Sequence, residues 1–319
     1  MKIIAIATAV AAVCVFQPAG ATEQPYPVRS VRVLVGLAPG GGTDTVARLI
    51  TAKLAEAFGQ SFVIDNRPGA GGNVVGELAA RATPDGYTLI TVTPTHVINP
   101  NLYRDVRYDA IKDFSAVARL TDSQYYLSIS NSLPASTLAE FLAFAKSSPK
   151  PISYASSGIG SANHLSGELF RTMSGLKLVH VPYKGGAPAL NALVAGEVQM
   201  SFTSSAALPL TKAGKLKTLA STGAKRSTAA PDVPTIAEAG VPGYVVVGWY
   251  GMAAPAKTPK AVIEKLNAAI NQALPELKDR YEAIGMEISG GTAEAFSTFL
   301  KAERDRWAQV VKISGAKVE

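Results

Sequence analysis

The stretch Leu34-Val35-Gly36-Leu37-Ala38-Pro39-Gly40-Gly41-Gly42-Thr43-Asp44 decides the fold that we expect for this chain. An apolar strand, predicted over residues 31–37, runs into three consecutive glycines, and a helix with an apolar stripe over residues 46–58 follows at once. Glycines let the backbone turn sharply, and the first turn of a helix presents N–H groups that have no acceptor within the helix. The positive end of the helix dipole lies at the same place. The junction therefore predicts a binding site for an anion such as a phosphate or a carboxylate.

Three more junctions between a strand and a helix carry glycine, serine or threonine, at residues 69–73, 156–163 and 183–186. The alternation of strand, loop and helix is typical of βαβ units on a parallel sheet, whose ligands lie beyond the carboxyl ends of the strands. The polar loop 93–96 follows a predicted strand in the same way. One such junction alone is more often structural than functional. Several together, split between two halves of the chain, predict a cleft lined with backbone donors.

Two long β-rich runs, residues 114–130 and 244–254, interrupt the alternation of strands and helices. We interpret them as crossings between two α/β lobes and expect residues 121–126 to lie beside residues 245–250. The predicted division gives residues 22–122 and 248–319 to lobe 1, and residues 123–247 to lobe 2.

The N-terminus has the pattern of a signal peptide, predicted over residues 1–21. Lys2 is followed by an apolar segment, and Ala19-Gly20-Ala21 has the small-x-small pattern of a cleavage site. The apolar segment, about 14 residues, is too short for a permanent membrane span. Cys14, the one cysteine, lies within it, so the mature chain has neither a disulfide nor a thiolate site.

Composition and motifs argue against several classes of function. The formal charge is +7, but the Lys and Arg residues are scattered, which disfavours nucleic acid as a partner. The glycine run lacks the lysine of a P-loop and the GxGxxG spacing, so no nucleotide cofactor is expected. The three histidines, His96, His164 and His180, do not have the spacing of metal ligands, and no GxSxG motif surrounds a serine. We therefore predict no metal, no cofactor and no catalytic residue.

Several runs, met in order along the whole mature chain, carry a family resemblance: Tyr26-Pro27, Pro39 to Asp44, Val63 to Gly72, Pro84 to Leu89, Ser157 to Ser161 with His164-Leu165, Val181 to Gly186, and Pro231 to Thr235. They resemble the Bug-type, TctC-like receptors, which are periplasmic solute-binding proteins of tripartite tricarboxylate transporters. The resemblance implies a two-lobe periplasmic-binding-protein fold (type II-like). Each lobe is expected to be a mostly parallel sheet flanked by helices, with a small organic acid in the cleft between the lobes.

In such receptors backbone N–H groups, hydroxyls and waters grip the carboxylates. Carried over by motif, the ligand-binding residues are expected to be Pro39, Gly40, Gly41, Gly42, Thr43, Asp44, Thr93, Thr95, His96, Ser156, Ser157, Gly160, Ser161, Asn163, Thr203 and Ser204. Many relatives have an acidic residue just after the strand that ends here in Ser201-Phe202-Thr203-Ser204-Ser205. Its absence disfavours amino-acid ligands and favours a mono- or dicarboxylate.

The resemblance implies a monomeric periplasmic receptor, not an enzyme, that delivers a carboxylate to the membrane subunits of a transporter. One alternative is a sensing subunit that docks on a membrane sensor kinase, because it would use the same binding chemistry. A third, less favoured hypothesis is a hydrolase that uses Ser156 or Ser157 with His164. His164 is expected just inside a helix, where it more often donates a hydrogen bond or packs.

Overall fold

The computed structural model describes residues 26–314, so the predicted signal peptide lies outside the described residues. The strands are β1 (Val31–Val35), β2 (Phe62–Asn66), β3 (Thr88–Val92), β4 (Phe114–Gln124), β5 (Tyr126–Ile129), β6 (Ile152–Ser156), β7 (Leu178–Pro182), β8 (Met200–Thr203), β9 (Lys217–Ser221), β10 (Val247–Pro255) and β11 (Met286–Ile288). The α-helices are α1 (Gly42–Phe58), α2 (Asn73–Ala80), α3 (Pro94–Ile98), α4 (Leu138–Ser147), α5 (Ala162–Ser174), α6 (Gly186–Ala195), α7 (Ala207–Lys212), α8 (Lys260–Ala273), α9 (Lys278–Glu282) and α10 (Ala293–Ser314). Short 3-10 turns occur at Ala70–Gly72, Asn99–Asn101 and Pro275–Leu277.

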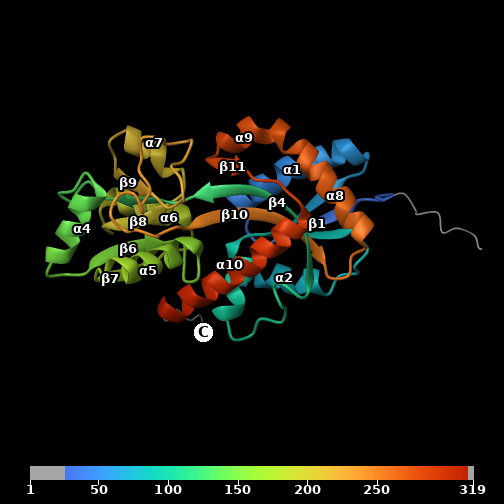
Figure 1. Ribbon diagram of the computed structural model, residues 1–319, viewed down its shortest axis with the longest axis horizontal. Helices are drawn as coiled ribbons and strands as arrows, with labels where there is room; N and C mark the ends of the chain where they lie inside the picture. The colour runs from blue at the N-terminus through green and yellow to red at the C-terminus, as the bar shows by residue number, and fades with distance from the viewer. Residues whose placement is uncertain (1–25, 315–319) are drawn as a thin grey trace, which may run out of the picture.

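The strands form two separate sheets, which define two lobes (Figure 1). Lobe 1 is built on the sheet β11-β4-β10-β3-β1-β2 with α1, α2, α3, α8, α9 and α10, and lobe 2 on the sheet β7-β6-β8-β5-β9 with α4 to α7. The predicted two-lobe α/β fold is confirmed. The sheets are mixed, however, and not mostly parallel. β1 pairs in parallel with β2 and β3, but β4, β10 and β11 pair antiparallel, as β5 does with β8 and β9. The strands that connect the lobes, β4 and β10, are antiparallel to their neighbours. The sequence of each strand taken alone does not indicate the direction of its partner.

The two lobes are joined by β4 and β10, which lie side by side along their length (Figure 1). Tyr250 pairs with Thr121, and Val247 pairs with Gln124, so the expected proximity of the two crossing segments is confirmed. Only Tyr125 separates the end of β4 in the first sheet from the start of β5 in the second. The predicted lobe boundaries at 122/123 and 247/248 fall within these strands, and the division there stays a prediction.

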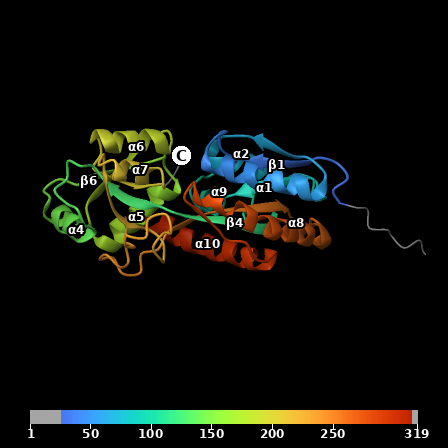
Figure 2. The same ribbon diagram turned by 90° about the horizontal axis from the view of Figure 1, so that it is seen from above.

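The last helix, α10, contacts both lobes (Figures 1 and 2). It packs on β4 and α3 in lobe 1 and on α5 in lobe 2. Its apolar stripe, which includes Phe296, Leu300 and Trp307, is buried. The indole N–H groups of Trp249 on β10 and of Trp307 both donate to Glu303, at 2.9 and 3.0 Å. These bonds fix the helix against the crossing strands.

Short-range sequence signals set the ends of several helices. α1 ends as expected at Gly59, which has the left-handed conformation (φ 64°) and donates its N–H to Ala55. At the start of α4, Glu140 donates its N–H to the hydroxyl of Thr137 over 3.2 Å, and this bond caps the helix. The expected loop at residues 93–96 is instead the first part of α3, and Pro94 begins that helix, a position that proline favours. Five-residue elements such as α3 and α9 are too short to show a clear apolar period.

Among the described residues, no helix combines the length and the apolar character that a membrane crossing requires.

Candidate functional site

A cavity of about 360 Å³ lies between the two lobes, at the crossing strands. Its lining residues come from lobe 1, lobe 2, β4, β10 and the link to β5: Leu37, Thr43, Gly71, Thr93, Pro94, Thr95, Asn99, Tyr103, Ser123, Tyr125, Ser157, Ile159, Gly160, Ser161, Ala162, Asn163, Gly248, Trp249 and Tyr250. A pocket built from both lobes can enclose a small molecule on opposite sides, which is typical of ligand sites between domains.

Two long helices begin at this cavity, one from each lobe. α1 starts after Gly41, which has no side chain to cap it, so the N–H groups of its first turn stay open. α5 starts after Ser161, whose hydroxyl accepts only from the N–H of His164. Thr43 in the first turn of α1 and Asn163 in the first turn of α5 both line the cavity. The positive ends of two helix dipoles therefore face one space from opposite sides.

Three tyrosine hydroxyls also belong to this space. Tyr103, Tyr125 and Tyr250 line the cavity, and their hydroxyls have no hydrogen-bond partner among residues 26–314. Two glycines leave room for them. A Cβ at Gly42 would lie 2.9 Å from the hydroxyl of Tyr250, and a Cβ at Gly71 would lie 3.2 Å from that of Tyr103. The phenols are thus available to donate to a bound molecule.

The side chain of Asn163 is oriented by its neighbour in the loop before α5. Its Oδ1 accepts from the hydroxyl of Ser157 over 2.9 Å and from the Ser157 N–H over 3.4 Å. The Nδ2 group has no acceptor within the described part of the chain, although the residue lines the cavity. Asn163 therefore presents N–H donors to the same space.

No residue that lines the cavity, within the chain from 26 to 314, carries a charge. The tyrosines remain neutral, because burial raises the pKa of Tyr250 to about 12 and also raises the pKa values of Tyr103 and Tyr125. An anion here would meet helix termini, phenols and an amide. Donors fixed in this way stabilise negative charge without a lysine or an arginine.

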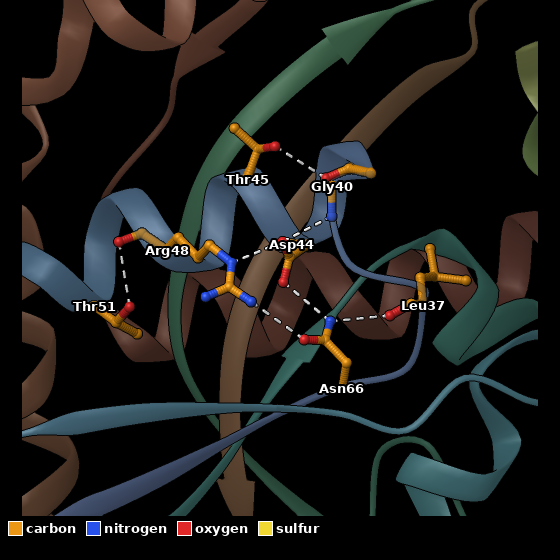
Figure 3. A network of polar contacts seen from close by, with 8 residues as sticks. Leu37, Gly40, Asp44, Thr45, Arg48, Thr51 and Asn66 are labelled. Carbon is orange, nitrogen blue, oxygen red and sulfur yellow. Dashed lines mark hydrogen bonds and ion pairs between the residues drawn. The ribbon is translucent and has the colours of Figure 1, made fainter.

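Asp44, one of the expected ligand-binding residues, has several partners within the fold. Figure 3 shows its carboxylate within a network that ties the glycine loop to α1 and β2. It accepts from the N–H of Gly40 (2.9 Å), from Arg48 (2.8 Å) and from Asn66 (3.0 Å). Burial by itself would raise the pKa of Asp44, but the hydrogen bonds, that from Arg48 first, outweigh it and lower the pKa to about 2. The residue is buried and ionised, and it holds the loop in place.

The expected ligand-binding residues separate into groups. Those that line the cavity are Thr43, Thr93, Thr95, Ser157, Gly160, Ser161 and Asn163. His96 borders a side cavity of about 20 Å³, and Gly42 and Ser204 line a groove between the lobes that also includes Ser205 and Gly285. The residues that line none of these spaces are Pro39, Gly40, Gly41, Asp44, Ser156 and Thr203. The binding roles of the whole set stay a prediction.

Three of the expected polar residues have partners inside the fold. Ser156 is fully buried, and its hydroxyl contacts His180 and Gly158. Thr203 donates to the carbonyl oxygen of Tyr126 over 3.1 Å, within the second sheet. His96 lies in α3 and shares a 3.1 Å hydrogen bond with the carbonyl oxygen of Ala110. Their polar atoms hold the scaffold of the site together.

Tyr103, Asn99, Ser123 and the tyrosines of the crossing strands were not expected to line the cavity. Tyr125 and Tyr250 lie in the two β-rich runs. The interpretation of these runs as crossings between the lobes was the one sequence feature that could have placed the two tyrosines at the cavity. The approach of Tyr250 to Gly42 depends on how distant segments pack, because the two residues are far apart in the chain.

No cluster of three or more metal-ligating side chains is found among the described residues.

Comparison with known proteins gives the family. Residues 46–316 match the model of the tripartite tricarboxylate transporter family receptor. The chain is 33% identical to protein BugT of Bordetella pertussis over 299 residues, which is 92% of each chain. It is 40% identical to the structure of R. palustris Rpa4515 with adipate, with a TM-score of 0.83, covering 92% of this chain and 100% of that one. MatC (Rpa3494) from Rhodopseudomonas palustris, with bound malate, is 36% identical with a TM-score of 0.78, over 90% and 100%.

The motifs quoted from the sequence, the two-lobe fold and these matches agree. This chain belongs to the tripartite tricarboxylate transporter receptor family, as a Bug-type solute-binding protein.

Proposed function

We propose that this protein captures a small organic acid, a mono- or dicarboxylate, between its two lobes and delivers it to the membrane subunits of a tripartite tricarboxylate-type transporter. The observation that carries the proposal is the uncharged cavity of about 360 Å³ between the lobes, where two helix N-termini and three unpaired phenols converge. Such a set of donors has many N–H and O–H groups to offer and no acidic group to repel an anion.

The arrangement supports a dicarboxylate in particular. α1 reaches the cavity from lobe 1 at Thr43, and α5 reaches it from lobe 2 at Asn163. One carboxylate at each helix N-terminus would hold the two lobes together. Two similar proteins, with adipate and with malate, were found with acids that have a carboxylate at each end of a short chain.

The hydrolase hypothesis fits the geometry poorly. The hydroxyl of Ser157 donates to Asn163, and Nδ1 of His164 accepts from the N–H of Gly160, so the two groups serve other partners. Ser156 does meet a histidine, since its hydroxyl lies 2.6 Å from Nε2 of His180, but it is fully buried and does not line the cavity. A nucleophile has to face the space that holds its substrate.

Periplasmic location and partnership with a transporter are part of the same proposal. Receptors of this family are periplasmic. The predicted signal peptide at residues 1–21 would bring the mature chain to that compartment.

A thermal-shift screen of organic acids, followed by calorimetric titration, tests the proposal. An acid at a hundred times its dissociation constant stabilises the folded chain by about 2.7 kcal/mol. Adipate and malate are the first candidates, each paired with its diamide as a control of equal length. We expect binding of an acid and none of its amide, because loss of a charge-assisted hydrogen bond costs about 1.5–3 kcal/mol at each end. Equal affinity for acid and amide would refute the proposed chemistry.

A further inference from the structure

Behind the loop that precedes α5, two imidazole rings lie face to face. His164, in the first turn of α5, and His180, on β7, have ring centroids 4.0 Å apart and an angle of 26° between their planes. The ring of Tyr154 on β6 lies beside the pair, 4.9 Å from that of His180 and 6.5 Å from that of His164. His164 is buried, and neither imidazole lines the cavity. The stack therefore does not touch a ligand in the cavity, and its effect has to pass through the loop.

His180 holds the start of this loop through Ser156. The Ser156 hydroxyl lies 2.6 Å from Nε2 of His180, and it also contacts both the N–H and the carbonyl oxygen of Gly158, each at 3.1 Å. A hydroxyl has one proton to donate and two lone pairs to accept with. All three contacts are satisfied only if Nε2–H of His180 donates to Ser156, while Ser156 donates to the Gly158 carbonyl. The geometry thus selects the Nε2–H tautomer of His180.

His164 holds the other end of the loop. Its Nδ1 accepts the backbone N–H of Gly160 over 3.1 Å, so Nδ1 carries no proton and Nε2 does. Gly160 lines the cavity and has the left-handed conformation (φ 79°), which is favourable for glycine. A proton on Nδ1 would set two donors against each other and break the contact. The next amides, at the start of α5, take their direction from this fixed peptide.

The surroundings keep both rings neutral. Burial lowers the pKa of His164, against the charge of Glu168 on the same helix, and burial together with His164 lowers the pKa of His180 to about 3. Glu168 itself is bonded to the hydroxyl of Tyr154 (2.7 Å) and paired with Arg171 (2.8 Å). These residues, from α5 and β6, are the charged and titratable groups that face the stack.

From these contacts we infer that the stacked pair His164–His180 positions the anion-binding loop of lobe 2, with His164 orienting the Gly160 peptide and His180 orienting Ser156. The inference rests on the proposed function, because the loop lines the proposed acid site. Neither histidine touches the acid. Each acts as a positioning residue whose neutral ring nitrogen sets the direction of a loop group.

Two variants separate hydrogen bonding from packing. His164→Asn keeps an acceptor where Nδ1 lies, and His164→Phe keeps a ring to stack on His180 but has no acceptor. We expect His164→Phe to bind adipate about tenfold or more weakly, as for a hydrogen bond lost at a buried donor. We expect His164→Asn to stay within about threefold of the unmodified chain. Equal affinity of His164→Phe and the unmodified chain, or equal weakness of both variants, would overturn the inference.

A second measurement needs no acid. In ¹⁵N NMR of the acid-free protein, Nδ1 of His164 should have the shift of an unprotonated acceptor, and the Gly160 amide should exchange slowly. The amide signals of residues 157–163 should move in His164→Phe and return in His164→Asn. A protonated Nδ1, or loop signals unchanged in His164→Phe, would overturn the inference even if that variant binds poorly. Should the unmodified chain bind no adipate, the proposed acid is wrong, while these spectra still decide the role of the pair.

Discussion

The hydroxyl of Ser205 donates a hydrogen bond to the carbonyl oxygen of Ile284 over 3.0 Å, and this bond joins lobe 2 to lobe 1. Ser205 lies in the link between β8 and α7, and Ile284 lies between α9 and β11. The next residue, Gly285, has φ 72°, and a Cβ there would lie 2.2 Å from that of Ser205. Glu287 makes a second link, since it accepts from the N–H and hydroxyl of Thr228 at 3.4 and 3.3 Å. The lobes are thus held at α9–β11 on one side of the crossing strands and by α10 on the other (Figure 1).

Removal of the Ser205 hydroxyl should weaken binding of the acid. If the lobes swing apart when the cavity empties, Ser205→Ala destabilises the arrangement in which lobe 2 contacts Ile284, relative to the open one. The expected loss is about 0.5–1.5 kcal/mol, the usual net value of one hydrogen bond. Affinity in calorimetric titration should fall by the corresponding factor. Ser147→Ala is the matched control, because Ser147, on α4 of lobe 2, donates its hydroxyl over 2.9 Å to a carbonyl oxygen of its own helix, that of Phe144. Equal affinities of the two variants would mean that the bond is the same with and without ligand.

The three glycines that begin α1 should respond differently to alanine. Gly40 has φ 81°, Gly41 is extended with φ −78° and ψ 171°, and a Cβ at Gly42 would meet the Tyr250 hydroxyl at 2.9 Å. Gly40→Ala should therefore lower the free energy of unfolding by about 1–3 kcal/mol. Gly42→Ala should instead reduce affinity for the acid, because it displaces a phenol of the site. Gly41→Ala meets nothing closer than the Ala38 carbonyl at 3.5 Å and should change neither.

Chemical denaturation and calorimetric titration of the three variants check this pattern. A loss of affinity in Gly41→Ala equal to that in Gly42→Ala would show that the loop amides, and not Tyr250, set the effect.

A negative charge at Asn163 should abolish most of the affinity for an acid. Asn163→Asp keeps the acceptor for Ser157 but replaces the N–H donors that face the cavity by a carboxylate oxygen. Repulsion between two like charges in a confined site and the lost hydrogen bond act together, so we expect a loss of about 2–4 kcal/mol in binding free energy. Asn191→Asp makes the same chemical change at an exposed position of α6 in lobe 2, and it should bind normally. Comparable affinity of the two variants would rule out an anion beside Asn163.

Burial of His96 should make the fold less stable in acid. Desolvation lowers the pKa of His96 from 6.5 to about 4, against a smaller opposite effect of its bond to Ala110. Between pH 6.5 and 4 His96 is protonated in the unfolded chain but neutral in the folded chain. The contribution of His96 to the free energy of unfolding is therefore complete above pH 6.5 and decreases as the pH falls toward 4. The slope from this one group reaches about 1.4 kcal/mol per pH unit. His96→Gln, which can still donate to Ala110, should flatten the slope by that amount.

Denaturant unfolding of both chains between pH 7.5 and 4.5 measures the difference, in which other titrating groups cancel. If the free energies of unfolding of the unmodified chain and of His96→Gln changed equally with pH, His96 would not be the group responsible.

Much of the scaffold could be predicted from local signals, while half of the site could not. Glycines 40–42 and the stop at Gly59 locate α1, because a helix start and end depend on a few neighbouring residues. The strand-to-helix order then gives two α/β lobes, and the serine and glycine loop before α5 falls in the cavity. Tyr250 beside Gly42, in contrast, depends on the register between β4 and β10 and on the packing of α1.

The same limit applies to polar residues that serve the scaffold. Asp44 follows three glycines at a helix start, a position equally suited to a ligand contact or to a backbone cap. Its assignment to the cap needed Arg48 and Asn66, from α1 and β2, in place around its carboxylate. Likewise, Ser156 meets His180 only because β6 and β7 pair in a particular register.

Because the cavity presents fixed dipoles and no charged side chain within the described chain, dissolved salt has little to screen there. Screening acts over about 8 Å at physiological ionic strength and weakens interactions between exposed charges far more than contacts inside a closed pocket. Capture of an acid should then change little between dilute and saline solutions.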